Sequence, residues 1–233
     1  MIAENIKHLR ERIAANCVEF ERNPQEIKLI AVSKFFGVDA IKEANRLGVT
    51  DFGENKAQEL RDKYEVLGDK VTWHFIGILQ RNKVKYAVRA ASYIHSVDSQ
   101  TLADEINKEA EKLNKVQNIL LEVNTSNEES KSGLSEKAEV INLVKYCSTL
   151  QNVKLIGLMA MAPFTDDTKI IRKSFADLRN LKDEINQNGF DLKELSMGMT
   201  NDYEIAIEEG ATMLRIGSAI FGERNYKTDW RQS

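Results

Sequence analysis

Cysteine and proline are scarce in this sequence, which has two of each among its 233 residues. Two cysteines as far apart as Cys17 and Cys147 form neither a disulfide framework nor the paired ligands of a zinc site. We therefore expect reduced thiols, a cytoplasmic protein and no metal. Long hydrophobic runs are also missing, because no segment approaches the roughly 20 apolar residues of a membrane helix. The first residues lack the basic and apolar regions of a signal peptide, so we expect neither secretion nor membrane contact.

A basic excess is absent as well. Lysine and arginine total 33 and aspartate and glutamate total 36, which leaves a formal charge of −3. A nucleic-acid-binding domain usually carries a basic excess, so we expect no nucleic-acid partner. Hydrophobic residues make up 42% of the chain, which is enough for a buried core and too much for intrinsic disorder.

Alternating strand-like and helix-like segments are the main structural signal. An amphipathic helix is expected over residues 1–22, ending before Asn23-Pro24. After it we expect strands at residues 29–33, 50–52, 72–76, 93–96, 118–123, 154–159, 194–196 and 213–216. Between them we expect helices at residues 38–47, 56–67, 82–90, 100–113, 136–150, 169–188 and 202–209, with a short helix beginning near Ser218.

Eight strands separated by helices predict a parallel sheet covered by helices. In a chain of this length they favour a closed (β/α)8 TIM barrel. We therefore expect a single α/β barrel domain over residues 1–233, with the N-terminal helix packed on it. An open doubly wound sheet is the alternative, although no GxGxxG or GxxxxGK[ST] motif follows any expected strand.

Two basic residues occupy notable places in the expected barrel, whose functional end lies at the carboxyl ends of its strands. Lys34 follows the first strand, and desolvation there would favour the neutral amine that forms a Schiff base with a carbonyl compound. A solvated loop lysine is the alternative. Arg215 lies within the apolar strand Met-Leu-Arg-Ile, where a buried guanidinium needs a partner. That partner is either a barrel carboxylate or a heteroatom of a ligand.

The loops after the seventh and eighth strands resemble a phosphate site in composition, and barrels often bind phosphate there. Ser196, Gly198 and Thr200 offer hydroxyl groups and close backbone approach. Gly217-Ser218 begins a short helix whose first N–H groups would face an anion, although an ordinary N-cap explains the pair equally well. A lysine, a phosphate site and a strand arginine together suggest pyridoxal phosphate, with its aldehyde, phosphate and ring nitrogen.

Several short motifs occur in order between residues 31 and 222. They are Ala31-Val32-Ser33-Lys34, Phe52-Gly53-Glu54-Asn55, Trp73-His74-Phe75-Ile76-Gly77 with Leu79-Gln80 and Asn82-Lys83, Ser130-Lys131-Ser132-Gly133, Gly157-Leu158-Met159, Leu195-Ser196-Met197-Gly198-Met199 and Arg215-Ile216-Gly217-Ser218-Ala219-Ile220-Phe221-Gly222. Through them the sequence resembles the pyridoxal phosphate homeostasis proteins, the small relatives of the alanine racemase barrel. The resemblance implies fold type III of the pyridoxal phosphate proteins.

For the site, the resemblance implies that Lys34 carries pyridoxal 5′-phosphate as an internal aldimine, that Asn55 faces the cofactor and that Arg215 reaches its ring nitrogen. It further implies phosphate contacts from Ser196, Met197, Gly217 and Ser218, and it adds as pocket candidates His74, Met159 and Thr200. His74 and Lys131 match family motifs without an assigned role. A hydrogen-bonded barrel histidine and a solvated loop lysine are the alternatives.

Two departures from the family pattern concern the mouth of the pocket. Phe35-Phe36-Gly37 stands where members of the family often have a Thr-Lys-Pro-like stretch, and Thr200 replaces the usual serine. Neither change removes a group that the cofactor needs.

The arginine partner bears on the expected function. Arginine keeps its proton, so it leaves the ring nitrogen unprotonated and makes the ring a weaker electron sink. We also expect no second domain of the kind that supplies an opposing base in racemases of this fold. We therefore expect no catalytic residues, and a monomeric protein that holds the cofactor reversibly for pyridoxal phosphate and amino-acid homeostasis. Pyridoxal phosphate-dependent apoenzymes are the candidate recipients.

Two other functions remain open from the sequence. An amino-acid racemase or decarboxylase of the same fold would exchange the α-proton of its substrate. A Schiff-base aldolase acting on a phosphosugar would use the same lysine and phosphate loops without a cofactor, and it would purify colourless.

Overall fold

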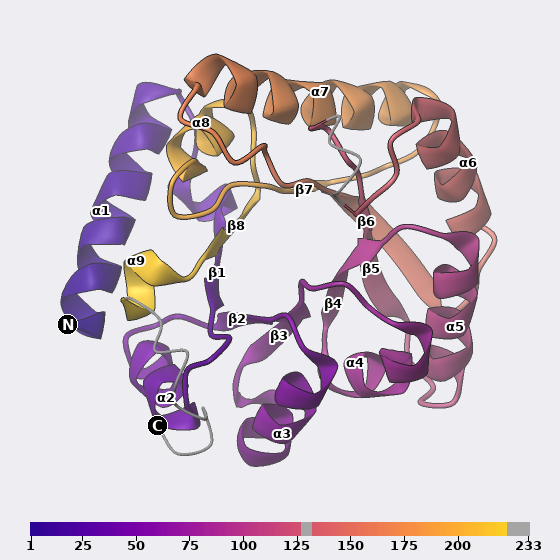
Figure 1. The fold of residues 1–233 in the computed structure, drawn as a ribbon, viewed down its shortest axis with the longest axis horizontal. Coiled ribbons are helices and arrows are strands. Elements are labelled where there is room, and N and C mark those ends of the chain that lie inside the picture. Colours follow the sequence, from indigo (N-terminus) through magenta and orange to yellow (C-terminus); the bar gives the residue numbers. More distant parts are fainter. Residues whose placement is uncertain (127–131, 223–233) are drawn as a thin grey trace.

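Eight parallel strands close into a barrel in the order of the chain, with β8 pairing back to β1 (Figure 1). The structure is a computed structural model that describes residues 1–126 and 132–222. The strands are β1 (Lys28–Val32), β2 (Asp51–Glu54), β3 (Thr72–Phe75), β4 (Tyr93–Val97), β5 (Gln117–Glu122), β6 (Val153–Met159), β7 (Glu194–Ser196) and β8 (Met213–Ile216). The closed sheet confirms the expected barrel and excludes the open doubly wound alternative.

Helices follow the strands and surround them. They are α1 (Ile2–Glu19), α2 (Val38–Arg46), α3 (Ala57–Leu67), α4 (Val84–Ala90), α5 (Gln100–Glu111), α6 (Lys137–Cys147), α7 (Thr168–Gln187), α8 (Tyr203–Glu208) and α9 (Ser218–Phe221). Short 3-10 helices occur at η1 (Pro24–Glu26), η2 (Gly68–Lys70) and η3 (Arg81–Lys83). Each element expected from the sequence is present, and its ends lie within three residues of the expected ones.

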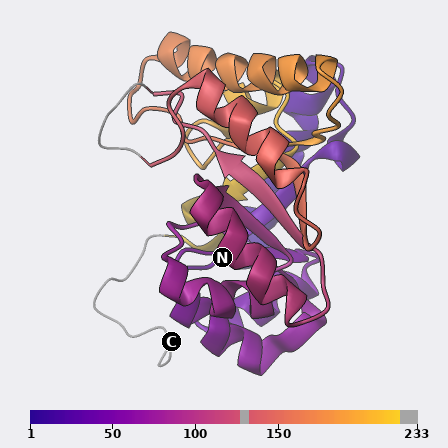
Figure 2. The same cartoon turned by 90° about the vertical axis from the view of Figure 1, so that its right-hand side faces the viewer.

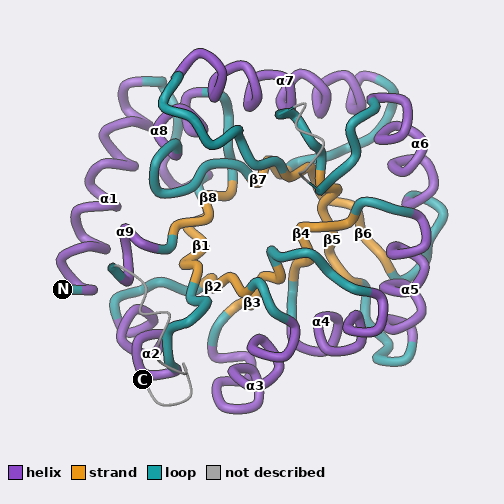
Figure 3. Tube along the Cα trace, in the orientation of Figure 1, coloured by secondary structure: helices purple, strands orange, loops and turns teal. Residues whose placement is uncertain are grey.

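Hydrophobic side chains pack on both sides of the barrel wall. In Figure 3 the strands form a central ring inside the helices, and Figure 2 shows from the side how the helices enclose them. The larger core lies between the two layers and includes Phe52, Trp73 and Phe175. A separate cluster fills part of the interior and consists of Ile30, Leu120, Met159 and Met213. Because side chains alternate across a strand, neighbouring residues such as Ile30 and Ala31 belong to different clusters.

The N-terminal helix α1 packs against α8 and α9, the helices that follow β7 and β8. Asn5 Nδ2 donates a hydrogen bond to the carbonyl oxygen of Ile220 in α9 at 2.9 Å. Beyond the end of α1, Arg22 Nη1 donates to the carbonyl oxygens of Ile207 and Ala211, at 2.8 and 2.7 Å. The contact with Ile220 holds α1 beside the loop after β8, in which the sequence places part of a phosphate site, and the contacts of Arg22 anchor the chain after α1 near the start of β8.

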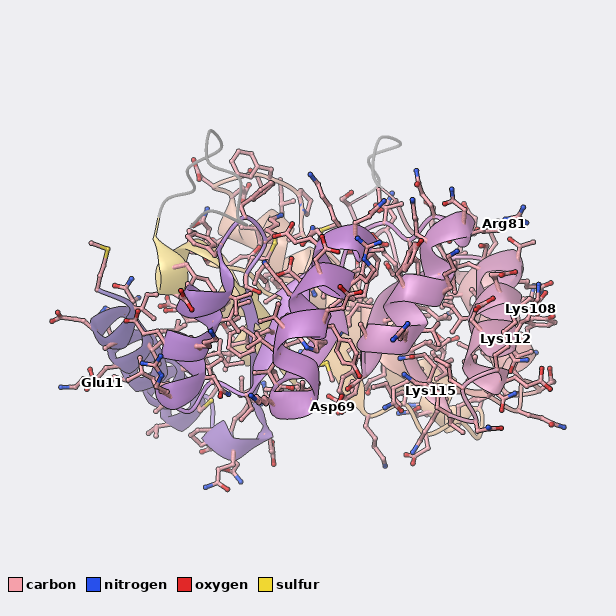
Figure 4. The ribbon with its side chains drawn as sticks, turned by 90° about the horizontal axis from the view of Figure 1, so that it is seen from below. Glu11, Asp69, Arg81, Lys108, Lys112 and Lys115 are labelled. Atoms are coloured by element: carbon pink, nitrogen blue, oxygen red, sulfur yellow. The ribbon has the colours of Figure 1, made fainter. Side chains whose placement is uncertain are left out.

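Charged side chains lie on the outside of the helical ring, as Lys108 on α5 and Lys112 directly after it show in Figure 4. Lys115 is more buried, and its ammonium donates to the carbonyl oxygens of Val88 and Ala91 at the end of α4, at 2.7 and 3.1 Å. Its burial lowers its pKa.

Both cysteines are buried and free. Cys147 is one of them, and burial raises the pKa of its thiol to about 12, so the thiol stays protonated. Among the helices of the described residues, none is long and apolar enough to cross a membrane.

Candidate functional site

Lys34 lies in a tight turn immediately after β1, at the carboxyl end of the barrel, and its side chain is half-buried. The next residue, Phe35, has a φ of +71°, a left-handed conformation that is unusual for a bulky residue. Its backbone N–H donates to Glu59 Oε1 of α3 at 2.9 Å, which helps to hold this conformation. Strain of this kind persists only where the surrounding structure enforces it, so the direction of the chain at Lys34 is fixed by its neighbours.

A buried ionic cluster formed by Ser33, Glu54, Glu59 and Lys63 supports this turn. Lys63 Nζ donates to the carbonyl oxygen of Ser33 at 2.8 Å, to Glu54 Oε1 at 2.7 Å and to Glu59 Oε1 at 2.8 Å. Ser33 Oγ donates to Glu54 Oε1 at 2.7 Å. The ammonium therefore connects the ends of β1 and β2 with α3. This cluster is not evident from the sequence, because Glu59 and Lys63 have the spacing of an ordinary surface ion pair on a helix.

Two carboxylates share one ammonium in this cluster, so one negative charge is left in excess. Burial raises the pKa of Glu54 to about 7; Lys63 opposes this shift and the neighbouring Glu59 adds to it. Glu54 Oε2 and Asn55 Oδ1, adjacent in sequence at the end of β2, are buried and have no hydrogen-bond partner in the described protein. A buried carbonyl oxygen without a partner is costly, so Asn55 is open to a ligand's hydrogen-bond donor.

Arg215 is buried in the barrel wall and is held by oxygen atoms from two other strand ends. Its Nη1 donates to both the carbonyl oxygen and Oγ of Ser196 at 2.7 Å, and its Nη2 donates to the carbonyl oxygen of Ala160 at 3.0 Å. Among the described residues no carboxylate contacts it, so the barrel ion pair left open by the sequence is not formed. Burial lowers the pKa of the guanidinium to about 10, and the more distant Asp202 and Glu122 oppose that shift.

His74 belongs to a chain of hydrogen bonds inside the barrel. Its Nε2 lies 2.9 Å from Asp51 Oδ1, and its Nδ1 lies 2.9 Å from Nε2 of His95. His95 Nδ1 lies 2.9 Å from Oγ of Ser196, which also contacts Arg215. The structure therefore has the hydrogen-bonded barrel histidine that the sequence left open as one interpretation of His74. His95 was missed, although a histidine within the apolar strand Tyr93–Val97 is a signal of the same kind as Arg215 in β8.

The loops after β7 and β8 meet as expected from the fold. Gly198 has a φ of +93°, and a Cβ on it would lie 2.6 Å from Cβ of Ala206, so the first loop requires glycine there. Ser218 Oγ and Thr200 Oγ1 lie 3.2 Å apart, which brings hydroxyl groups of the two loops together. Gly217 precedes α9, and the first N–H groups of a helix have no acceptor within it.

The other residues named from the sequence have diverse surroundings. Met197 is buried in the outer core, and its N–H donates to the carbonyl oxygen of Met213 at 3.1 Å. Met159 is buried in the inner cluster. Phe36, one of the two departures at the mouth, stacks on Phe221 of α9 with ring centroids 4.9 Å apart. Lys131 lies outside the described residues.

Comparison with known proteins finds relatives that match this chain along nearly its whole length and that belong to one family. A model of the alanine racemase N-terminal domain family matches residues 5–225. The pyridoxal phosphate homeostasis protein of Aquifex aeolicus is 44% identical over 225 residues, which cover 96% of this chain and 98% of that protein. The pyridoxal phosphate homeostasis protein of Escherichia coli is 37% identical over 233 residues, which cover 97% of each.

Solved structures agree with these sequence relatives. PipY of Synechococcus elongatus, solved with pyridoxal phosphate bound, superposes with a TM-score of 0.83 at 35% identity and covers 95% of this chain and 100% of PipY. The alanine racemase of Clostridium difficile superposes with a TM-score of 0.72 at 15% identity, covering 94% of this chain and 56% of the racemase. At that identity the second likeness shows a shared fold alone.

The buried cluster generates a prediction about pH. The pKa of Glu54 is about 7 in the folded protein and 4.5 for the ordinary group, so the native state binds this proton more tightly than the unfolded chain. The stability that Glu54 contributes is complete below about pH 4.5 and is lost by about pH 7, with a limiting slope near 1.4 kcal/mol per pH unit. We predict that Glu54→Gln flattens this part of the curve, as measured by urea unfolding of the ligand-free protein. The exposed Glu65→Gln on α3, the helix that carries Lys63, is the control; equal slopes in all three proteins would contradict the prediction.

Proposed function

We propose that this chain, which belongs to the pyridoxal phosphate homeostasis proteins of the alanine racemase N-terminal domain family, binds pyridoxal 5′-phosphate reversibly and buffers its intracellular level. The observation that carries the proposal is the buried guanidinium of Arg215 at the same end of the barrel as Lys34. A relative that is 35% identical over its full length has been solved with this cofactor bound. We propose apoenzymes that depend on the cofactor as its recipients.

The residues at the carboxyl end of the barrel fit the chemical groups of the cofactor. Bound pyridoxal phosphate supplies an aldehyde that condenses reversibly with a primary amine, and a pyridine ring that can withdraw electrons. The guanidinium of Arg215 has five N–H groups. Three hydrogen bonds engage it within the described protein, which leaves two N–H groups for a ligand. A pyridine nitrogen with a free lone pair is a suitable acceptor for one of them.

Lys34 and Asn55 serve the cofactor from the ends of adjacent strands. Lys34 is the covalent anchor, since it is half-buried after β1 and its backbone is held by the cluster around Lys63. Asn55 places an amide beside this anchor, and its buried carbonyl oxygen has no partner in the described protein. The amide therefore gains a hydrogen bond when a polar ligand fills the site.

We assign the phosphate to Thr200, Gly217 and Ser218. The hydroxyl groups of Thr200 and Ser218 already lie side by side. The N–H of Ala219, at the start of α9, donates to Thr200 Oγ1 at 3.5 Å, so backbone and hydroxyl donors of the two loops gather at one point. Ser196 and Met197 are weaker candidates. The hydroxyl of Ser196 is engaged by Arg215 and His95, and the N–H of Met197 bonds within the sheet.

The same arginine argues for holding rather than turnover. Because the pKa of Arg215 is lowered only to about 10, the guanidinium stays charged near neutral pH and donates to the ring nitrogen. A nitrogen that accepts this hydrogen bond from a cation does not take up a proton of its own, so the ring withdraws electrons weakly. We therefore propose that the protein is not an efficient racemase or decarboxylase, although it has the barrel fold of the alanine racemases.

The first prediction concerns the anchor. Wild-type protein incubated with pyridoxal phosphate should turn yellow, and borohydride should then fix the cofactor irreversibly on Lys34. Lys34→Ala should lose the colour and remain folded, because a half-buried residue in a loop contributes little to the core. Lys42→Ala, an exposed lysine on α2, is the matched control. Absorption spectra and peptide mapping are the measurements; a label on another lysine, or a colourless wild-type protein, would refute the assignment and favour a cofactor-independent aldolase.

The second prediction concerns the phosphate. Pyridoxal without phosphate should bind at least about 10²-fold more weakly, because each hydrogen bond to a charged group contributes roughly 1.5–3 kcal/mol and several act together. Gly217→Val should weaken binding of the phosphorylated form more than Ser218→Ala does, since a bulky side chain blocks backbone approach whereas the serine variant lacks one hydroxyl. Equilibrium dialysis measures both ligands, and equal affinities for them would sink the assignment.

The third prediction concerns turnover. Cofactor-loaded protein should not racemise or decarboxylate L-alanine, L-serine or L-lysine faster than free pyridoxal phosphate does. A positioned general base alone contributes about 10²–10⁴-fold, and this site pairs a weak electron sink with no assigned base. Chiral chromatography after long incubation is the measurement. A turnover rate of about one per second is the low end for ordinary enzymes. Turnover at that rate, abolished in Lys34→Ala, would show that the protein is an enzyme.

A further inference from the structure

A continuous chain of hydrogen bonds crosses the inside of the barrel and ends at Arg215. We call Asp51, His74, His95, Ser196 and Arg215 the barrel relay. Its successive heavy-atom distances are 2.9, 2.9, 2.9 and 2.7 Å. Asp51 is the first residue of β2 and Ser196 the last of β7, so the relay runs from the amino end of the barrel toward the carboxyl end. Every member is buried.

The donors of the relay all point the same way. An ionised Asp51 accepts only, so Nε2 of His74 carries the proton. A neutral His74 then accepts at Nδ1, which requires the proton of His95 on Nε2 as well. His95 in turn accepts at Nδ1, so the hydroxyl of Ser196 donates to it. The oxygen of Ser196 is left to accept from Arg215, in agreement with the 2.7 Å contact to Nη1.

The surroundings keep the two histidines neutral and the two ends charged. Burial lowers the pKa of both histidines, with Asp51 opposing this for His74 and with His74 and Arg215 adding to it for His95. The pKa of Asp51 is held below its usual value, because hydrogen bonds from His74 and Thr50 outweigh its burial.

Charged groups at the two ends complete these surroundings. Lys28 Nζ lies 3.5 Å from Asp51 Oδ1, and Glu194 acts on His74 from β7. Asp202 and Glu122 act on Arg215 at the other end. Tyr93 stacks on His74 with ring centroids 4.5 Å apart, which fixes the plane of that imidazole.

We propose that Asp51, His74, His95 and Ser196 are positioning residues that lock the guanidinium of Arg215 as a hydrogen-bond donor to the cofactor's ring nitrogen. Their dipoles are aligned, with acceptor atoms toward the arginine cation and donor protons toward the aspartate anion. Each bond in such a chain polarises the next, so the carboxylate contributes to the environment of Arg215 without touching it. The relay thereby offsets the buried charge of Arg215, which no carboxylate of the described residues contacts directly. This inference rests on the proposed function for its ligand and on the ligand-free structure for its geometry.

The far end of the relay is accessible to experiment. Asp51 lines a cleft of about 610 Å³ at the amino end of the barrel, which also contains Lys28, Glu26 and Glu194. Asp51→Asn preserves the shape of the side chain and removes its charge, so the amide can either accept from His74 or donate to it. Glu26→Gln removes the same charge from an exposed residue of the same cleft and is the matched control.

The first measurement is made on the ligand-free protein by nitrogen-15 NMR of the imidazole rings. The chain has three histidines, so His8→Gln identifies the exposed one and leaves His74 and His95. We expect both buried rings in the Nε2–H tautomer in the wild type and in Glu26→Gln, and a mixture of tautomers in Asp51→Asn. Nδ1–H as the main wild-type form of either ring would overturn the direction of the relay.

The second measurement is the visible spectrum and affinity of bound pyridoxal phosphate. We expect Asp51→Asn to shift the absorption maximum and to weaken binding about tenfold, whereas Glu26→Gln changes neither. His95→Leu should have the same effect as Asp51→Asn, and His95→Gln should restore the wild-type values because its amide can accept from Ser196 and donate to His74. The proposed role of the relay would be overturned if Asp51→Asn and His95→Leu bound the cofactor with the absorption maximum and the affinity of the wild type. A wild-type protein that keeps the expected tautomers but binds no pyridoxal phosphate would overturn the proposed function instead.

Discussion

The buried charge of Arg215 is the constraint around which one side of the site is built. A guanidinium inside a closed barrel is out of reach of bulk water, and burying a charge is costly unless hydrogen bonds satisfy it. The ends of β6 and β7 supply those bonds from the oxygen atoms of Ala160 and Ser196. This requirement keeps the ends of β6 and β7 within hydrogen-bond reach of Arg215, and it commits the hydroxyl of Ser196 to the arginine.

A second buried cation organises the opposite side of the site. Lys63 joins the ends of β1 and β2 through Ser33 and Glu54, and it reaches Glu59 in α3. The strained turn at Phe35 depends on this cluster, because Glu59 bonds to the lysine and to the backbone of that turn. Breaking a buried pair by removing one partner typically costs about 3–5 kcal/mol, so Lys63 holds this part of the barrel mouth in one arrangement.

Two rigid sides suit a protein that holds its ligand. A preformed site spends little of its binding energy on ordering loops, so affinity can come from one covalent link and a few hydrogen bonds. With Arg215 at the ring nitrogen as proposed, the same geometry would limit chemistry, because a charged arginine there does not draw electrons out of a bound amino acid as an acidic partner would. Under the proposed function, holding and poor catalysis would have one physical origin, which is a permanently protonated residue at that position.

Local pattern in the sequence determined the architecture and the outline of the site. Periods of two and of about 3.6 residues located the strands and helices, and alternation of the two types predicted the barrel. The rule that barrel sites lie after the strands then selected Lys34 and the loops at Thr200 and Ser218 as candidates, and the family resemblance added Asn55. Tertiary structure alone decided which charges are buried and which side chains meet. Lys63 has the spacing of a surface lysine, and the contact between His95 and Ser196 joins residues 101 positions apart. Such contacts depend on the stagger of strands around the closed barrel, and the stagger is set by packing of the whole wall rather than by any segment of the chain.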